Sequence, residues 1–106
     1  MNQFSLPDLK NKKIVFSTYF FNQKNYNFRF EWCETFFIVD IYFTKNGETK
    51  YLLKGFPLVA NYNLIERIKS PDLISGSLAV KNKYGNDVVI DRENFSTDFV
   101  LVYEEE

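Results

Sequence analysis

The sequence predicts a small all-β domain of about seven short, mainly antiparallel strands that form a sandwich or a barrel. Three observations support this fold class. Apolar and polar residues alternate with a period of two, turn signals separate the apolar runs, and aromatic residues make up 19% of the chain. Helix is expected in at most one short segment, near residues 61–68. Aromatic residues suit a small core because each buried ring removes about 150–250 Å² from water.

The first half of the chain predicts a meander of four strands, and the second of these carries the clearest signal. Between positions 26 and 32, four aromatic residues alternate with three polar ones. Such alternation is typical of a strand with one face in the core and one in water. We therefore expect the four rings to face inward; they belong to Tyr26, Phe28, Phe30 and Trp32. The four expected strands are 14–21, 26–32, 36–43 and 49–54.

The third expected strand, 36–43, is apolar on both of its faces. A strand of this kind is normally covered on both sides, here by a second sheet or by another subunit. The turn that follows contains Asn46-Gly47, which is the strongest short hairpin signal. The fourth strand should therefore pair antiparallel with the third.

The second half of the chain is less regular. The step Gly55-Phe56-Pro57-Leu58 is expected to end the fourth strand. The stretch 61–68 is either one or two helical turns, capped by Asn61 or Asn63, or an extended loop. Turns and loops are expected at 70–72, 84–87 and 91–96, and short strands at 77–81, 88–90 and 98–103.

We expect a single domain over residues 1–106, with an N-terminal arm at 1–12 and a frayed acidic tail at 104–106. The arm carries three lysines that should be exposed to solvent. The 13 basic and 14 acidic residues give a net charge of −1, which argues against a nucleic-acid partner. No stretch approaches the ~18 apolar residues of a membrane helix, and the N-terminus lacks a signal-peptide pattern. We therefore expect that the protein is made and folded in the cytoplasm, or that it leaves the cell by lysis or through a dedicated machine. The three lysines are Lys10, Lys12 and Lys13.

The residue types exclude several catalytic chemistries. The chain has no histidine and only one cysteine, Cys33. A Ser-His-Asp or Cys-His arrangement, a Cys/His zinc site and an intramolecular disulfide are therefore impossible within one chain. The four glycines form neither a GxGxxG motif nor a P-loop, and no acidic spacing matches a calcium loop. We expect no catalytic residues, no cofactor and no metal ion.

Three carboxylates require a separate interpretation. A glycosidase would need two carboxyl groups facing each other across a cleft. The simpler interpretation is that Glu31 points to water, Glu34 lies in a turn and Asp40 has a structural partner. An acid in the middle of an apolar strand either lies at a sheet edge or contacts a cation, here Arg29 or Arg92.

The aromatic residues leave a second class of function open. Rings on a sheet can stack on bases or sugars, so a small ligand- or carbohydrate-binding β module is the alternative function. The strict alternation of the second strand nevertheless favours a core role for its rings. The apolar residues also exceed what one face of a lone sheet needs. Because exposed apolar patches mark interaction surfaces, we expect permanent neighbours.

Several short motifs follow one another in a distinctive order. The apolar strand Phe37–Ile41 with its acid is followed by the Asn46-Gly47 turn, the stretch Leu53–Ile65, Gly76-Ser77-Leu78 and the apolar C-terminal run 99–104. In this order they resemble the baseplate plug family of contractile phage tails, over about residues 12–104. Two features depart from the family pattern. Trp32 lies in the second strand, whereas the pattern places it at about Phe36 or Phe37, and Asn61 stands where glycine is expected. Asparagine adopts the left-handed conformation more readily than most other residues, so the turn can be retained.

The resemblance implies a structural protein, not an enzyme. It would be a multi-copy β adaptor or plug of a contractile phage-tail or tail-like baseplate, near the tube, hub or spike. It would be located in the virion and assembled in the host cytoplasm. The implied partners are other baseplate or tail proteins and copies of itself, without nucleic acid, membrane or small-molecule substrate. The candidate interface residues lie in and after the Gly-x-Pro-Leu step: Gly55, Phe56, Pro57, Leu58, Asn61 and Tyr62.

Overall fold

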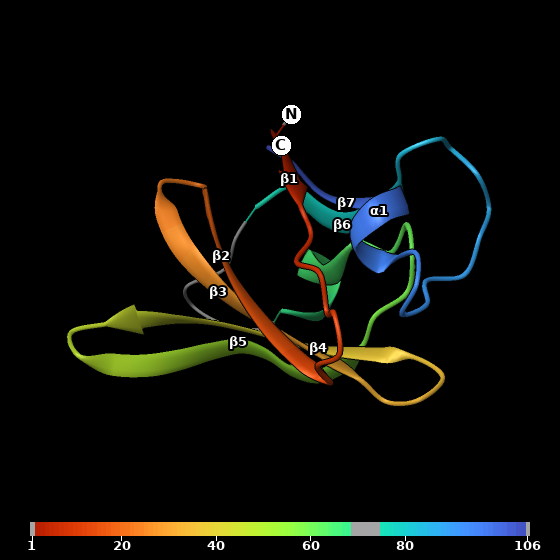
Figure 1. Cartoon of the computed structure of the whole chain (residues 1–106). Helices are drawn as coiled ribbons and strands as arrows, with labels where there is room; N and C mark the ends of the chain where they lie inside the picture. Colours follow the sequence, from red (N-terminus) through yellow and green to blue (C-terminus); the bar gives the residue numbers. More distant parts are fainter. Residues whose placement is uncertain (1, 69–74, 106) are drawn as a thin grey trace.

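The computed structural model describes residues 2–68 and 75–105, which form two antiparallel sheets, as the sequence predicts. The larger sheet has the strand order β2-β3-β4-β5 and the smaller has the order β1-β7-β6. Figure 1 shows the smaller sheet above one face of the larger, with the β4–β5 hairpin extending past it. The elements are β1 (Asn2–Ser5), β2 (Ile14–Phe21), β3 (Lys24–Trp32), β4 (Phe37–Lys45), β5 (Glu48–Pro57), the 3-10 helix η1 (Leu64–Arg67), β6 (Ser77–Asn82), α1 (Phe95–Asp98) and β7 (Phe99–Glu104).

The core lies between the two sheets and is rich in aromatic rings. The inward orientation predicted for the alternating strand is confirmed. Tyr26, Phe28 and Phe30 are buried, and Trp32 is partly buried against the core. Phe21 joins the two layers, because its ring centroid lies 4.5 Å from that of Tyr26 on β3 and 4.7 Å from that of Tyr103 on β7. Tilted and offset ring pairs of this kind add to the stabilisation that burial provides.

The β4–β5 hairpin confirms the turn signal at Asn46-Gly47. Both residues have positive φ, 54° and 78°, as a type I′ turn requires. The expected end of the fourth strand at Gly55 is wrong, because β5 continues to Pro57. The register between β4 and β5 shifts on both sides of Ile41. Gly55 adopts a left-handed φ of 62°. A bulge of this kind accommodates the glycine without ending the strand.

The segment 61–68 forms the short 3-10 helix η1, which agrees with the helical alternative. Asn63 is its N-cap and accepts a hydrogen bond from the Ile65 N–H.

The strand expected at 88–90 is wrong, because residues 85–90 form no regular element. Val88 and Val89 are exposed, and Ile90 is the residue of this apolar run that is buried in the core. The predicted turn at 70–72 lies outside the described residues.

The loop expected at 91–96 is partly wrong, since α1 begins at Phe95. The Asp91 carboxylate accepts hydrogen bonds from the N–H groups of Glu93 and Asn94, both at 2.8 Å. This local turn leads the chain into the helix, and Phe95 is fully buried. The side chain of an aspartate thus favours a turn that the apolar pattern does not predict.

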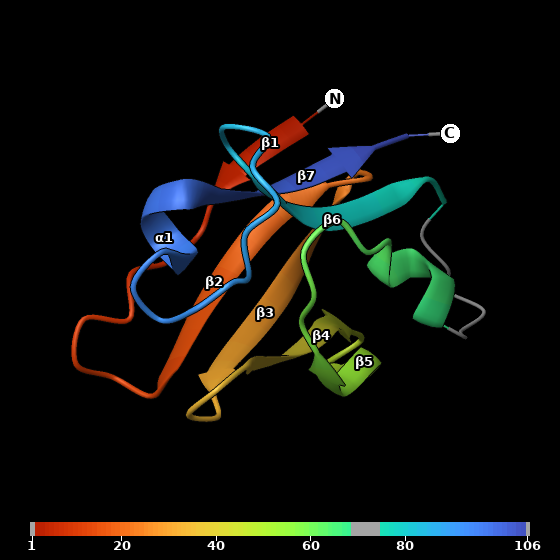
Figure 2. The ribbon, with the colours of Figure 1, turned by 90° about the vertical axis from the view of Figure 1, so that its right-hand side faces the viewer.

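Two strands include terminal residues that were not expected to be in strands. Figures 1 and 2 show β1 beside the end of β7, and Asn2 pairs with Tyr103 in this ladder. Within the expected arm 1–12, strand β1 was not predicted, because four residues carry too little pattern. Phe4 nevertheless packs on the ring of Tyr19 at 5.2 Å. Glu104 pairs with Ser77 and belongs to β7, so the expected fraying at this position is wrong.

Candidate protein-binding surfaces

The outer face of the four-stranded sheet carries exposed apolar side chains. The smaller sheet covers the inner face only (Figures 1 and 2), so the two-sided apolar run in β4 is not explained by a second layer. Phe16 and Phe20 on β2 are 62% and 63% exposed, and Tyr51 on β5 is 50% exposed. Ile38 and Tyr42 on β4 are half-buried on the same face. The sequence left two alternatives for covering both faces of this strand, a second sheet or another subunit. Because the second sheet covers only the inner face, another subunit is the remaining alternative for the outer face.

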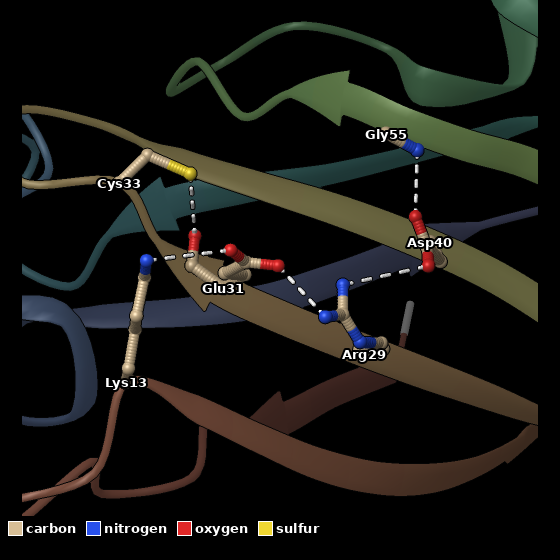
Figure 3. A network of polar contacts seen from close by, with 6 residues as sticks. All are labelled: Lys13, Arg29, Glu31, Cys33, Asp40 and Gly55. Atoms are coloured by element: carbon tan, nitrogen blue, oxygen red, sulfur yellow. Dashed lines mark hydrogen bonds and ion pairs between the residues drawn. The ribbon is translucent and has the colours of Figure 1, made fainter.

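A polar network crosses the middle of this outer face (Figure 3). The Arg29 guanidinium on β3 lies 2.7 Å from a Glu31 carboxylate oxygen and 3.7 Å from an Asp40 carboxylate oxygen. Lys13 lies 3.8 Å from the other Glu31 oxygen. The second Asp40 oxygen accepts a hydrogen bond from the Gly55 N–H at 2.6 Å. Of the two cations predicted as partners of Asp40, Arg29 is therefore the one that contacts it.

The network is a structural arrangement of paired charges. Two cations and two carboxylates balance, and both acids contact the same guanidinium instead of facing each other across a cleft. Arg92, the other predicted partner, donates to the backbone oxygens of Lys10 and Lys12. Among residues 2–68 and 75–105, no group of three acidic or cysteine side chains is arranged to hold a metal ion. Glu31 and Asp40 are therefore not arranged as the two facing carboxyl groups of a glycosidase.

The sequence-predicted interface residues divide into two groups. Phe56 and Tyr62 come together, with their rings stacked at 5.7 Å and an interplanar angle of 28°. The Arg67 side chain completes this stack, because its guanidinium carbon lies 5.9 Å from the Phe56 ring centroid and its Nε donates to the Tyr62 hydroxyl at 2.9 Å. Gly55 and Pro57 are exposed on the same strand as Phe56.

The second group has mainly structural contacts. Leu58 is buried in the core, and its N–H donates to the Phe37 carbonyl at 2.8 Å. This side chain is therefore not presented to a partner. Asn61 is exposed with φ of 66°, so asparagine does adopt the left-handed conformation at this turn. Its N–H donates to the Val80 carbonyl and fixes the loop against β6.

A smaller apolar groove lies at one end of the molecule. It is lined by Thr35 and Phe36 just before β4, by residues that follow β5 and by the irregular segment before α1. Phe36, Val59, Val88 and Val89 are each at least 44% exposed there. Sequence reasoning missed this groove and the outer-face rings of β2. The outer-face rings of β2 could have been predicted, because the run Ile14–Phe21 carries apolar residues on both faces, as the run 36–43 does.

Three of the four rings in the row proposed as an alternative ligand platform are not available for stacking, and the fourth, Trp32, is partly buried against the core. Tyr26, Phe28 and Phe30 are at most 1% exposed and lie beneath the second sheet. Cys33 is partly buried, with its thiol 3.8 Å from the Glu31 carbonyl. No helix in the described part of the chain is long and apolar enough to span a membrane.

These features define a small two-sheet β protein whose distinctive parts are exposed apolar faces. The whole chain, residues 1–106, matches the protein family described as "Cyanophage baseplate Pam3 plug gp18". The protein belongs to this family of phage baseplate plugs, which confirms the predicted family. Membership makes it a structural component of the virion tail that interacts with other baseplate proteins. No curated protein and no solved structure matches the chain.

Proposed function

We propose that the protein is a multi-copy adaptor of a contractile-tail baseplate, located near the tube, hub or spike and assembled in the host cytoplasm. The match of the entire chain to a baseplate plug family is the observation that carries this proposal. The apolar outer face and the apolar end groove support it, since exposed patches of this kind mark protein contacts. In this role the protein has no catalytic activity and no cofactor.

The stack of Phe56, Tyr62 and Arg67 is the proposed contact with neighbouring baseplate proteins. Aromatic and arginine side chains are the residue types that most often dominate binding energy at interfaces. Here the rings hold each other at 5.7 Å, and Arg67 is fixed to the Tyr62 hydroxyl. The stack is therefore ordered before a partner binds, which lowers the entropic cost of association. Gly55 and Pro57 border it on β5, while Leu58 anchors the strand end in the core.

Purified tail particles provide the test. We expect the protein to co-purify with the baseplate in several copies, and deletion of its gene to leave particles without it. Complementation with Phe56→Asp should give a folded protein that is not incorporated. Tyr84→Asp is the matched control, because this ring is 68% exposed and lies outside the stack. Absence of the wild-type protein from tails would refute the proposed function, and normal incorporation of Phe56→Asp would refute the proposed contact.

A further inference from the structure

We propose that two copies of the free protein pair face to face through the outer face of the β2-β3-β4-β5 sheet. The twofold axis would run parallel to the strands, between β3 and β4. This inference goes beyond the baseplate role and does not depend on it. It follows from the order in which four residues cross the sheet.

One row of the outer face is self-complementary. Phe16 pairs with Arg29 across β2 and β3, and Arg29 pairs with Asp40 across β3 and β4. Gly55 on β5 completes the row through its N–H bond to the Asp40 carboxylate (Figure 3). The row thus contains a projecting ring, a positive charge, a negative charge and a bare glycine. A Cβ built at Gly55 would meet no atom within 4 Å other than those of its two chain neighbours. One of these neighbours, Lys54, places its ammonium 4.8 Å from the Tyr51 ring centroid.

The proposed axis places each member of this row over its complement. A half-turn about it puts β2 of one copy over β5 of the other, and β3 over β4. Phe16 then lies over Gly55 of the second copy, and Arg29 lies over Asp40 of the second copy. A twofold contact requires this kind of self-complementarity. Twisted sheets that pack face to face with their strands nearly aligned form the usual geometry of a β-sandwich.

The neighbouring row of residues across the sheet is also self-complementary under the half-turn. Thr18, Asn27, Tyr42 and Tyr51 lie in register across the four strands. The half-turn places Asn27 over Tyr42 and Thr18 over Tyr51 of the second copy, so that polar groups meet hydroxyls. Neither of the two rows brings like charges together. This matters because like charges opposed across an interface cost several kcal/mol.

The polar network lowers the cost of covering the face. Burying an unpaired charge is strongly unfavourable, whereas a paired and hydrogen-bonded charge is tolerated. Here the side chains of Asp40, Glu31 and Arg29 are already only 10%, 20% and 27% exposed, and each has an internal partner. A second copy would therefore remove little remaining hydration from these three side chains while it covers the rings of Phe16, Phe20 and Tyr51.

The area fits a weak specific pair. Four strands of about eight residues give a face of roughly 500 Å² per copy from standard strand spacings. Two such faces bury about 1,000 Å², which is near the lower bound for a specific interface. A micromolar dissociation constant is therefore expected. Copies arranged in a ring around an axis use heterologous contacts instead, so the twofold pair is a contact of the free protein.

Sedimentation velocity of the purified chain over about 1–200 μM, a range chosen for a small interface, tests the proposal. We expect a concentration-dependent monomer–dimer equilibrium. Phe16→Asp should raise the dissociation constant at least about tenfold, as for a central interface residue. Gly55→Asn should do the same by adding a side chain where Phe16 of the second copy would lie, since asparagine tolerates the left-handed conformation there. Tyr84→Asp, an equally exposed ring outside the face, should leave the equilibrium unchanged.

Circular dichroism and thermal melts of each variant separate loss of pairing from loss of folding. A wild-type protein that stays monomeric over the whole range would overturn the proposal. So would a dimer that neither Phe16→Asp nor Gly55→Asn weakens, since another surface would then form it. Either result would leave the baseplate proposal intact, because that proposal is decided by the composition of tail particles.

Discussion

The Asp40 carboxylate on β4 accepts a hydrogen bond from the Gly55 N–H on β5, at 2.6 Å. The bond spans the point where the register between the two strands shifts. A bulge leaves a ladder group unpaired, and here a side chain takes the place of the missing carbonyl. The same carboxylate faces Arg29 on β3, so one acid links three strands of the larger sheet.

Replacement of this acid should therefore destabilise the fold. Asp40→Ala leaves the Gly55 N–H without its acceptor, and we expect a loss of about 1.5–3 kcal/mol, as for hydrogen bonds to charged groups. Asp40→Asn keeps an acceptor oxygen and should lose less. Urea unfolding followed by circular dichroism measures both. If Asp40→Ala matched the wild type in free energy of unfolding, the bond would contribute nothing.

The strands that the sequence predicts well are those with a clear period of two or a strong turn. The alternating rings of β3 and the Asn46-Gly47 turn each determine local structure with few residues. In contrast, β1 is only four residues long, and its place depends on pairing with β7 at the other end of the chain. Val88-Val89-Ile90 shows the opposite error, because β-branched residues favour strands only when a neighbouring strand is there to pair with them.

The candidate surfaces were harder to predict than the fold. The position of Phe56 beside Tyr62 depends on how β5 continues past Gly55, and this continuation was not expected. Leu58 carries the same kind of apolar side chain as its neighbours, so sequence alone does not separate the core residue from the exposed ones. The outer face emerges only when the register places Phe16, Arg29 and Asp40 in one row.

Leu58 and Phe56 should respond differently to the same substitution. Leu58 is 6% exposed, so Leu58→Asp removes core packing and buries an unpaired charge. We expect a loss of at least about 4 kcal/mol, which is most of the free energy of unfolding at the lower end of the range for a domain of this size. Phe56 is partly exposed, and Phe56→Asp should remain folded with a lower melting temperature. Thermal melts compare the two, and a cooperative transition for Leu58→Asp near that of the wild type would contradict its core position.

The Asn63 side chain joins η1 to β6. Its Oδ1 accepts hydrogen bonds from the Ile65 N–H at 3.1 Å and from the Leu78 N–H at 3.0 Å. Asn63→Ala removes both acceptor contacts, and we expect a loss of about 2 kcal/mol from the cap and the edge of the strand together. Asn63→Asp retains the oxygen and serves as the control. Equal stability of the alanine and aspartate variants in urea unfolding would refute the role of this oxygen.

Tyr19 and Tyr103 should make the protein sensitive to alkaline pH. Burial raises the pKa of both phenols above the ordinary value of 10.0, and the negative charge of Glu105 adds to the shift at Tyr103. Their hydroxyls donate to the backbone oxygens of Ser5 and Ser75, at 2.8 and 2.9 Å. A phenol with a raised pKa in the folded state holds its proton there while the unfolded chain releases it.

The sign of the effect follows from this difference. Below pH 10 the phenols are neutral in both states, so their contribution to stability is complete. As the pH rises from 10 through the higher pKa of the folded state, the unfolded chain ionises first and stability falls, by up to about 1.4 kcal/mol per pH unit for each phenol. Tyr19→Phe and Tyr103→Phe should each reduce this slope. Urea unfolding between pH 8 and about 11.5 measures it, and a slope unchanged in the double variant would assign alkaline unfolding to other groups.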